Sequence, residues 1–144
     1  MLLRLALALF LTFGAPAWAQ DWSSAVTVVQ RDLAQGGTVL GTTLIPNSTD
    51  PASADRALGV VYVYIEGSAG NSTLESGLFQ RGPAGWQLHR RVNGLIGASP
   101  REPRFDTSGF YLTTSTLGPA DPRCCPSQET AWFVDWVTGQ AIER

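Results

Sequence analysis

The sequence contains no lysine, a single histidine and only two cysteines, and these shortages exclude several kinds of chemistry. A phosphate-binding loop needs a lysine after its glycines, so this chain cannot form one. Metal sites built from several histidines or from C-x-x-C pairs are absent as well. The G-x-S-x-G turn, which presents the nucleophile of many serine hydrolases, does not occur. We therefore favour a protein that is not an enzyme and that carries no cofactor and no metal.

The first 19 residues are typical of a cleavable secretory signal. Arg4 supplies a positive charge, residues 5–13 form an apolar run, and Gly14 and Pro16 then break the helix. Residues 17–19 place alanine at both positions that a signal peptidase recognises. The apolar run is too short to cross ~30 Å of hydrocarbon, and no cysteine follows it for lipid attachment. We expect cleavage after residue 19, no membrane anchor afterwards, and a periplasmic or secreted protein.

Residues 20–144 are long enough for one small domain with its own core. They contain nine arginines and twelve acidic residues, so their net charge is near −3. A surface of this charge offers no basic patch for nucleic acid or for an anionic membrane. We expect no nucleic acid as a partner, and instead an envelope protein or a small ligand.

The domain is predicted to start with a helix. Ser23 or Ser24 can cap it, Val29 and Leu33 lie on one apolar stripe with Trp22 and Val26, and glycines 36 and 37 end it. Six strands are predicted after it, over residues 38–45, 58–65, 74–81, 86–92, 110–117 and 130–137. Residues 93–104 are predicted to be irregular, because they carry two glycines and two prolines.

These elements predict an α+β fold, with one N-terminal helix packed on a mostly antiparallel sheet of five or six strands. Residues 58–65 are apolar at both alternating sets of positions, which is typical of a central strand covered on each side. Closure of the sheet into a small barrel is an alternative.

The segment 118–127 holds both cysteines, which are neighbours in the chain, at Cys124 and Cys125. In an oxidising compartment the two can bond to each other, pair with another chain, or stay reduced. A bond between them would be strained, because a disulfide prefers Cα atoms 4.4–6.8 Å apart and a trans peptide holds neighbours at 3.80 Å. The ring it closes is minimal, so it would add little stability and would mainly make the loop rigid.

We take this segment as the candidate functional loop. Its candidate residues are Asp121, Arg123, Cys124, Cys125, Pro126 and Ser127. The leading hypothesis is a rigid surface that contacts an envelope partner or ligand. The alternative is thiol chemistry, either disulfide exchange or capture of Cu(I) by the adjacent pair. Lowering the pKa of a thiol needs a nearby cation, and Arg123 is the only one close in sequence.

Other residues allow weaker functional hypotheses. The arginines 81, 90, 91, 101 and 104 could bind an anion, although a solvated sheet face is the simpler interpretation. Trp132 and Trp136 alternate in one strand, which is more typical of a core than of a carbohydrate platform. Two carboxylate pairs, Glu66 with Glu75 and Asp121 with Glu129, could supply an acid and a base, and His89 could serve a hydrolase.

Short motifs also resemble known families of bacterial secreted proteins. The string D-x-x-C-C-P-S at residues 121–127 looks like a motif of uncharacterised members of this group. Residues 61–82, with an E-G-x-x-G turn and a later R-G turn, are similar to the LppP/LprE lipoprotein family of actinobacteria. The resemblance implies an envelope or secreted location and a β-rich fold, and it implies no catalytic residue. Unlike that family, this chain lacks the lipid-attachment cysteine.

Overall fold

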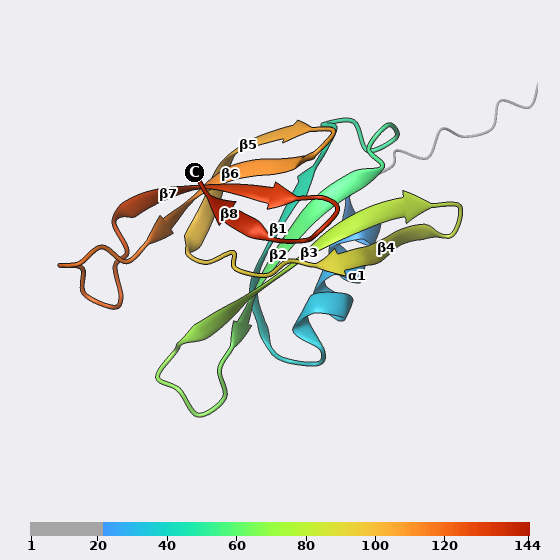
Figure 1. Ribbon diagram of the computed structural model, residues 1–144. Coiled ribbons are helices and arrows are strands. Elements are labelled where there is room, and N and C mark those ends of the chain that lie inside the picture. Colours follow the sequence, from blue (N-terminus) through green and yellow to red (C-terminus); the bar gives the residue numbers. More distant parts are fainter. Residues whose placement is uncertain (1–21) are drawn as a thin grey trace, which may run out of the picture.

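The computed structural model describes residues 22–144, so the predicted signal at residues 1–19 lies outside the described part. The described residues form one α-helix and eight strands in two four-stranded antiparallel sheets (Figure 1). The first sheet has the order β1-β2-β3-β4 and the second has the order β5-β6-β7-β8. The elements are α1 (Ser23–Ala34), β1 (Val39–Pro46), β2 (Arg56–Tyr64), β3 (Ser72–Gly82), β4 (Gly85–Arg91), β5 (Ala98–Asp106), β6 (Gly109–Thr116), β7 (Gln128–Asp135) and β8 (Ala141–Glu143).

The predicted α+β fold, with one helix on a single sheet of five or six strands, is therefore wrong, because the described residues are mostly β and form two sheets. All six predicted strands exist, but four belong to one sheet and two to the other. Two further strands, β5 and β8, were not predicted. Both belong to the second sheet, where they flank β6 and β7. Strand periodicity reports which face a side chain occupies, and it does not report which strands are paired.

Strand β5 was missed because its prolines favour an irregular segment. Pro100 and Pro103 are tolerated because β5 lies at the edge of its sheet, where a missing N–H need not break the ladder. The strand is also interrupted by two register shifts against β6, and Ser99 and Glu102 have positive φ angles of 52° and 53°. These irregularities hide the alternation of side chains that would predict a strand.

The chain passes from the first sheet to the second through residues 92–97, and this connection also links the sheet edges. The backbone N–H of Asn93 donates to the carbonyl of Gly139 at 2.9 Å, and Ala141 N–H donates to the carbonyl of Asn93 at 2.8 Å. Asn93 and Gln140 thus form a parallel bridge between the β4 side and the β8 side. At the opposite edges no pairing joins β1 to β5 within residues 22–144, so the predicted alternative of a closed barrel is not formed.

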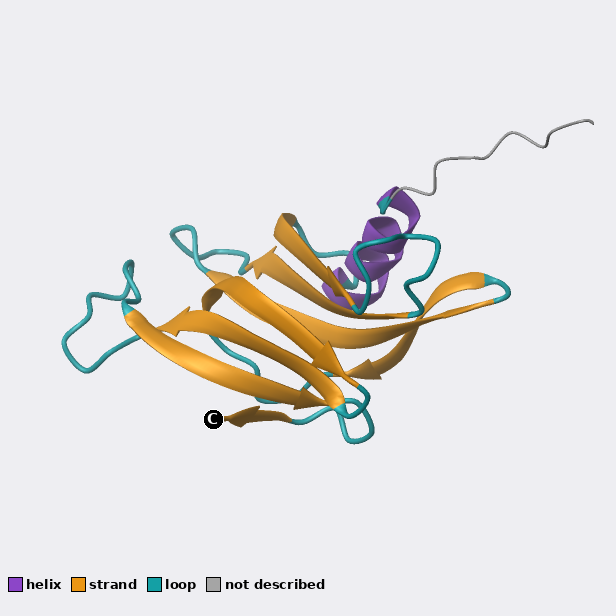
Figure 2. Ribbon diagram, turned by 90° about the horizontal axis from the view of Figure 1, so that it is seen from above, coloured by secondary structure: helices purple, strands orange, loops and turns teal. Residues whose placement is uncertain are grey.

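Three layers result, with the helix on one face of the first sheet and the second sheet on the other face (Figure 2). Strand β2 supplies both interfaces: Ala57 and Val61 pack toward the helix, and Leu58 and Val60 pack toward the second sheet. All four side chains are fully buried, which confirms the prediction of a central strand covered on each side.

Two members of the predicted stripe, Val29 and Leu33, are buried together with Ala25, whereas Trp22 and Val26 are only partly buried. Its predicted serine cap is wrong, because Trp22 takes the N-cap position and makes no side-chain capping hydrogen bond. At the other end Gln35 and Gly36 adopt left-handed conformations, as the predicted stop at glycine requires.

Candidate functional site

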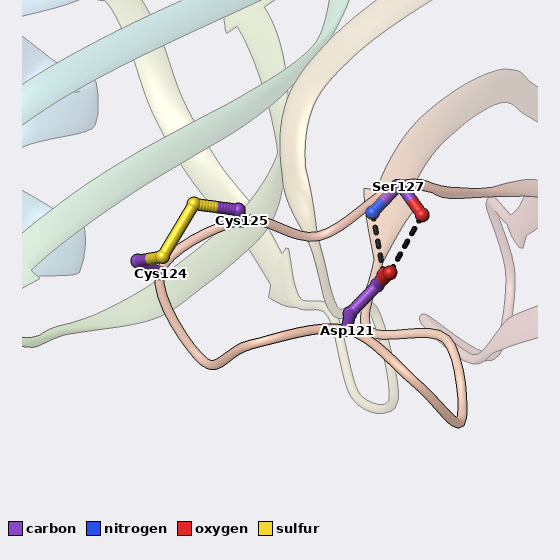
Figure 3. Close-up of a disulfide and its surroundings, with 4 residues drawn as sticks. All are labelled: Asp121, Cys124, Cys125 and Ser127. Atoms are coloured by element: carbon purple, nitrogen blue, oxygen red, sulfur yellow. Dashed lines mark hydrogen bonds between the residues drawn. A yellow bond between two sulfur atoms is a disulfide. The ribbon is translucent and has the colours of Figure 1, made fainter.

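The candidate loop connects β6 to β7 and protrudes at the end of the molecule where the β2–β3 turn also lies (Figures 1 and 2). We call residues 117–127 the cysteine loop. Asp121 holds its two ends together, because its carboxylate accepts hydrogen bonds from Gly118 N–H at 2.8 Å and from Ser127 N–H at 2.7 Å. The Ser127 hydroxyl donates to the same carboxylate at 2.7 Å (Figure 3).

These donors favour the charged form of the carboxyl group. The Gly118 N–H is the largest cause, followed by the hydroxyl and the N–H of Ser127, and together they hold the pKa of Asp121 below its usual value. The predicted loop residues Asp121 and Ser127 are thus brought into direct contact. Their interaction closes the base of the cysteine loop.

At the tip of the cysteine loop, Cys124 and Cys125 are joined by a disulfide across a trans peptide, with their Cα atoms 3.8 Å apart. This is the first of the three redox outcomes predicted for the pair. The Cys125 N–H donates to the carbonyl of Pro122 at 2.9 Å, so both cysteines belong to a turn over residues 122–125. Both cysteines are exposed residues at the surface of the loop.

A groove of about 660 Å³ lies beside the cysteine loop, and we call it the end groove. Arg123 and Pro126 of the loop line one part of it. The other walls come from the start of β3, from the connection between the sheets, from the facing ends of β6 and β7, and from Glu143 of β8. The predicted loop residues thus belong to a larger site that is built from both sheets.

The floor of the end groove is fixed by buried side chains. Trp132 is 6 % exposed, and its Nε1–H donates to the hydroxyl of Thr114 at 2.8 Å. That hydroxyl donates in turn to the carbonyl of Ile96 at 2.8 Å, which ties the connecting segment to the second sheet. The hydroxyls of Thr116 and Thr130 are hydrogen-bonded to each other at 2.6 Å. Their polar groups are therefore satisfied, and the floor needs no ligand to complete it.

The rim of the end groove combines apolar and charged side chains. Ile96 and Leu117 are large apolar residues that remain 56 % and 54 % exposed. Arg123 makes no hydrogen bond and no ion pair with any of residues 22–144. Among residues 22–144, Glu143 is the one carboxylate that lines the groove, and it lies across from Trp132 in the β7–β8 ladder. An uncovered apolar rim with an unpaired cation is typical of a binding surface.

The central arginines do not converge on one site. Arg91 binds Glu75 at 3.2 Å and the carbonyl of Asp32 at 2.8 Å. Arg101 forms an ion pair with Glu129, and the guanidinium of Arg104 lies 4.2 Å from the ring centre of Tyr111. The guanidinium of Arg81 donates hydrogen bonds to the backbone carbonyls of Pro51 and Ala52. These four arginines have separate structural roles and Arg90 is exposed on β4, which favours the interpretation of a solvated sheet face. Glu75 and Glu129, members of the proposed carboxylate pairs, are paired with these arginines.

Trp132 and Trp136 lie in the core, as their alternation in the sequence indicated. They are only 6 % and 8 % exposed. His89 stacks on the ring of Trp136, with ring centres 4.9 Å apart, and the guanidinium of Arg56 lies 4.7 Å from the same ring. Among residues 22–144, no three His, Cys, Asp or Glu side chains come together in a way that could hold a metal ion.

The helix that the structure describes is too short and too polar to cross a membrane. Comparison with protein-family models, with curated proteins and with solved structures gives no match to this chain. The resemblance to the LppP/LprE family therefore stays a prediction from short motifs.

Sequence reasoning found the cysteine loop and missed the groove beside it. Thr114 and Thr116 lie on one alternating face of the strand predicted at residues 110–117, and Thr130 shares a face with Trp132, so the sequence does contain a signal for this row of hydroxyls. Ile96 and Gly97 gave no such signal, because their part in the groove depends on the connection between the two sheets.

Proposed function

We propose that this protein is an exported binding domain of the bacterial envelope, which is not an enzyme and which contacts a partner protein or ligand through the cysteine loop and the end groove. The observation that carries the proposal is that Arg123 and Pro126, on the disulfide-bonded loop, line the same groove as the exposed Ile96 and Leu117. Export is supported by the predicted signal at residues 1–19 and by the disulfide, which is typical of oxidising compartments.

The rigidity of the cysteine loop favours binding. Its backbone is restrained at the base by Asp121, at the tip by the disulfide, and along its length by Pro119, Pro122 and Pro126. Ordering a flexible loop on binding costs entropy, and a loop that is already ordered avoids much of that cost. A loop that is held in this way therefore binds more tightly than a flexible loop that makes the same contacts.

Site-specific photo-crosslinking in the source bacterium tests this proposal. A benzophenone side chain replaces Pro119, which is exposed on the cysteine loop, or Thr107, which is exposed in the turn at the opposite end of β6. We expect a discrete crosslinked product from position 119 and none from position 107. Equal products from both positions, or none from position 119, would reject the loop as the contact surface.

Exposure of both cysteines favours thiol chemistry as a second candidate. A partner dithiol would attack one sulfur, pass through a mixed disulfide and leave as a disulfide, while Cys124 and Cys125 each gain a hydrogen. The reduced pair could then bind Cu(I) as thiolates. Titration in dithiothreitol redox buffers, followed by competition for Cu(I) with a colorimetric chelator, measures both steps. A disulfide that is not reduced by mild dithiothreitol would reject disulfide exchange. Failure of the reduced pair to compete for Cu(I) would reject copper binding.

A further inference from the structure

One edge of β7 is open where it runs beside the end groove. Strand β8 pairs with β7 only from Trp132 to Val134, and Arg144 N–H adds one more hydrogen bond, to the carbonyl of Ala131 at 3.0 Å. Within residues 22–144 no strand pairs with this edge nearer to the cysteine loop. The edge therefore presents backbone groups that another strand could use.

The alternation along β7 identifies those groups. Asp135 N–H donates to Gln140 and Ala131 accepts from Arg144, so the odd-numbered residues of β7 direct their backbone groups toward the β8 side. Glu129 is the next residue in this series, and its N–H and carbonyl face the open edge. Its side chain is engaged elsewhere, in the ion pair with Arg101.

The even-numbered side chains of the same strand line the end groove, at Gln128, Thr130 and Trp132. A strand added beside Glu129 would therefore lie along the groove and would place every second side chain in it. The exposed side chains of Ile96 and Leu117 supply apolar contacts at the rim. Main-chain pairing with pockets for alternate side chains is how sheet edges recognise peptides.

We propose that the end groove binds an extended peptide that pairs antiparallel with β7 at Glu129 and directs its C-terminal carboxylate toward Arg123; this rests on the proposed binding function and names its partner. We assign the peptide the direction of β8, which runs antiparallel to β7 and toward the cysteine loop. A strand with the same direction reaches the loop with its C-terminal end. There Arg123 is the unpaired cation.

The charges of the groove also define the sequence of the peptide. Glu143 lines the groove on the side away from the loop and disfavours a second acidic group there. The preferred peptide has apolar side chains at alternate positions, and its terminal carboxylate is its only negative charge within the groove.

The probe is a pool of acetylated, fluorescent hexapeptides with leucine, valine or phenylalanine at alternate positions, made with either a free C-terminal carboxylate or an amide. Binding to the oxidised mature protein is measured by fluorescence anisotropy. We expect the free acids to bind about tenfold more tightly than the amides, which is the range of one charge-assisted hydrogen bond. Arg123→Ala removes this preference, whereas Arg104→Ala, the matched exposed arginine on β5, keeps it.

A second comparison tests the strand pairing. N-methylation of the peptide amide that faces Glu129 removes a donor and is expected to abolish binding, whereas N-methylation of the next amide leaves it nearly unchanged. Binding of acids and amides with equal affinity, or tolerance of both methylations, would overturn the proposal. Laurate serves as a competing ligand. If it binds more tightly than the peptides, displaces all of them and depends on Arg123, the groove is a site for amphiphilic anions instead. Crosslinking from position 119 without any peptide binding would reject the peptide and leave the proposed function standing.

Discussion

The carboxylate of Asp121 accepts two hydrogen bonds from Ser127, one from the backbone N–H and one from the hydroxyl, each at 2.7 Å. The two are six positions apart in sequence, and the disulfide-bonded pair lies between them. The contact thus defines the shape of the loop that carries Arg123 to the end groove.

Protonation of Asp121 is expected to loosen the cysteine loop at acid pH. Its pKa is lowered in the folded protein, so the interaction is fully present above the unfolded pKa of about 3.9 and is lost as pH falls through the folded value. Nuclear magnetic resonance of the Ser127 and Gly118 amides between pH 7 and pH 2 measures this change. Asp121→Asn should show loosened amides already at pH 7, and an unchanged spectrum of that variant would contradict the role of the carboxylate.

Removal of the disulfide is expected to leave global stability nearly unchanged. A ring between adjacent residues restricts the unfolded chain very little, so a Cys124→Ser, Cys125→Ser double variant should shift the Tm by less than about 2 °C. Intact mass with and without reductant checks the starting state, since the monomer should gain the mass of two hydrogen atoms on reduction. Complete alkylation without reductant would show that the bond is absent in solution.

Substitution of Gly97 is expected to destabilise the fold and to deform the end groove. Gly97 has a φ of +101°, and an added Cβ would lie 2.5 Å from the hydroxyl oxygen of Thr114 and 2.8 Å from the carbonyl of Ser115. Gly97→Ala should lower the free energy of unfolding by at least about 1–3 kcal/mol, measured by urea denaturation. Gly82→Ala is the matched control, because no atom lies within 4 Å of its added Cβ. Equal stability of the two variants would contradict this account.

The hydroxyl pair on the groove floor predicts a non-additive double-mutant cycle. Thr116 and Thr130 are 9 % and 5 % exposed and hydrogen-bonded to each other, so Thr130→Val leaves the hydroxyl of Thr116 without that partner. Each single valine variant is expected to cost about 1–3 kcal/mol, and the double variant less than the sum, because no polar group is then left unpaired. Additive costs in urea denaturation would show that the two hydroxyls act independently.

Local elements could be predicted because they depend on residues close in the chain. The helix stripe at Val29 and Leu33 and the two-sided burial of β2 follow from side-chain period and composition. The adjacent cysteines could likewise be placed in one loop, because two flanking strands and three prolines bound it. The failure at β5 has a local cause too, since prolines at a sheet edge resemble prolines in a loop.

By itself, then, the sequence determined the helix, six of the strands, the two-sided burial of β2 and the position of the vicinal cysteines. Only the tertiary structure decided that the strands divide into two sheets, that Asn93 bridges to Gln140, and that Arg123 shares a groove with Ile96 and Trp132. The physical reason is that alternation specifies the face of a strand, whereas strand partners and the groove between sheets depend on contacts between residues far apart in the chain.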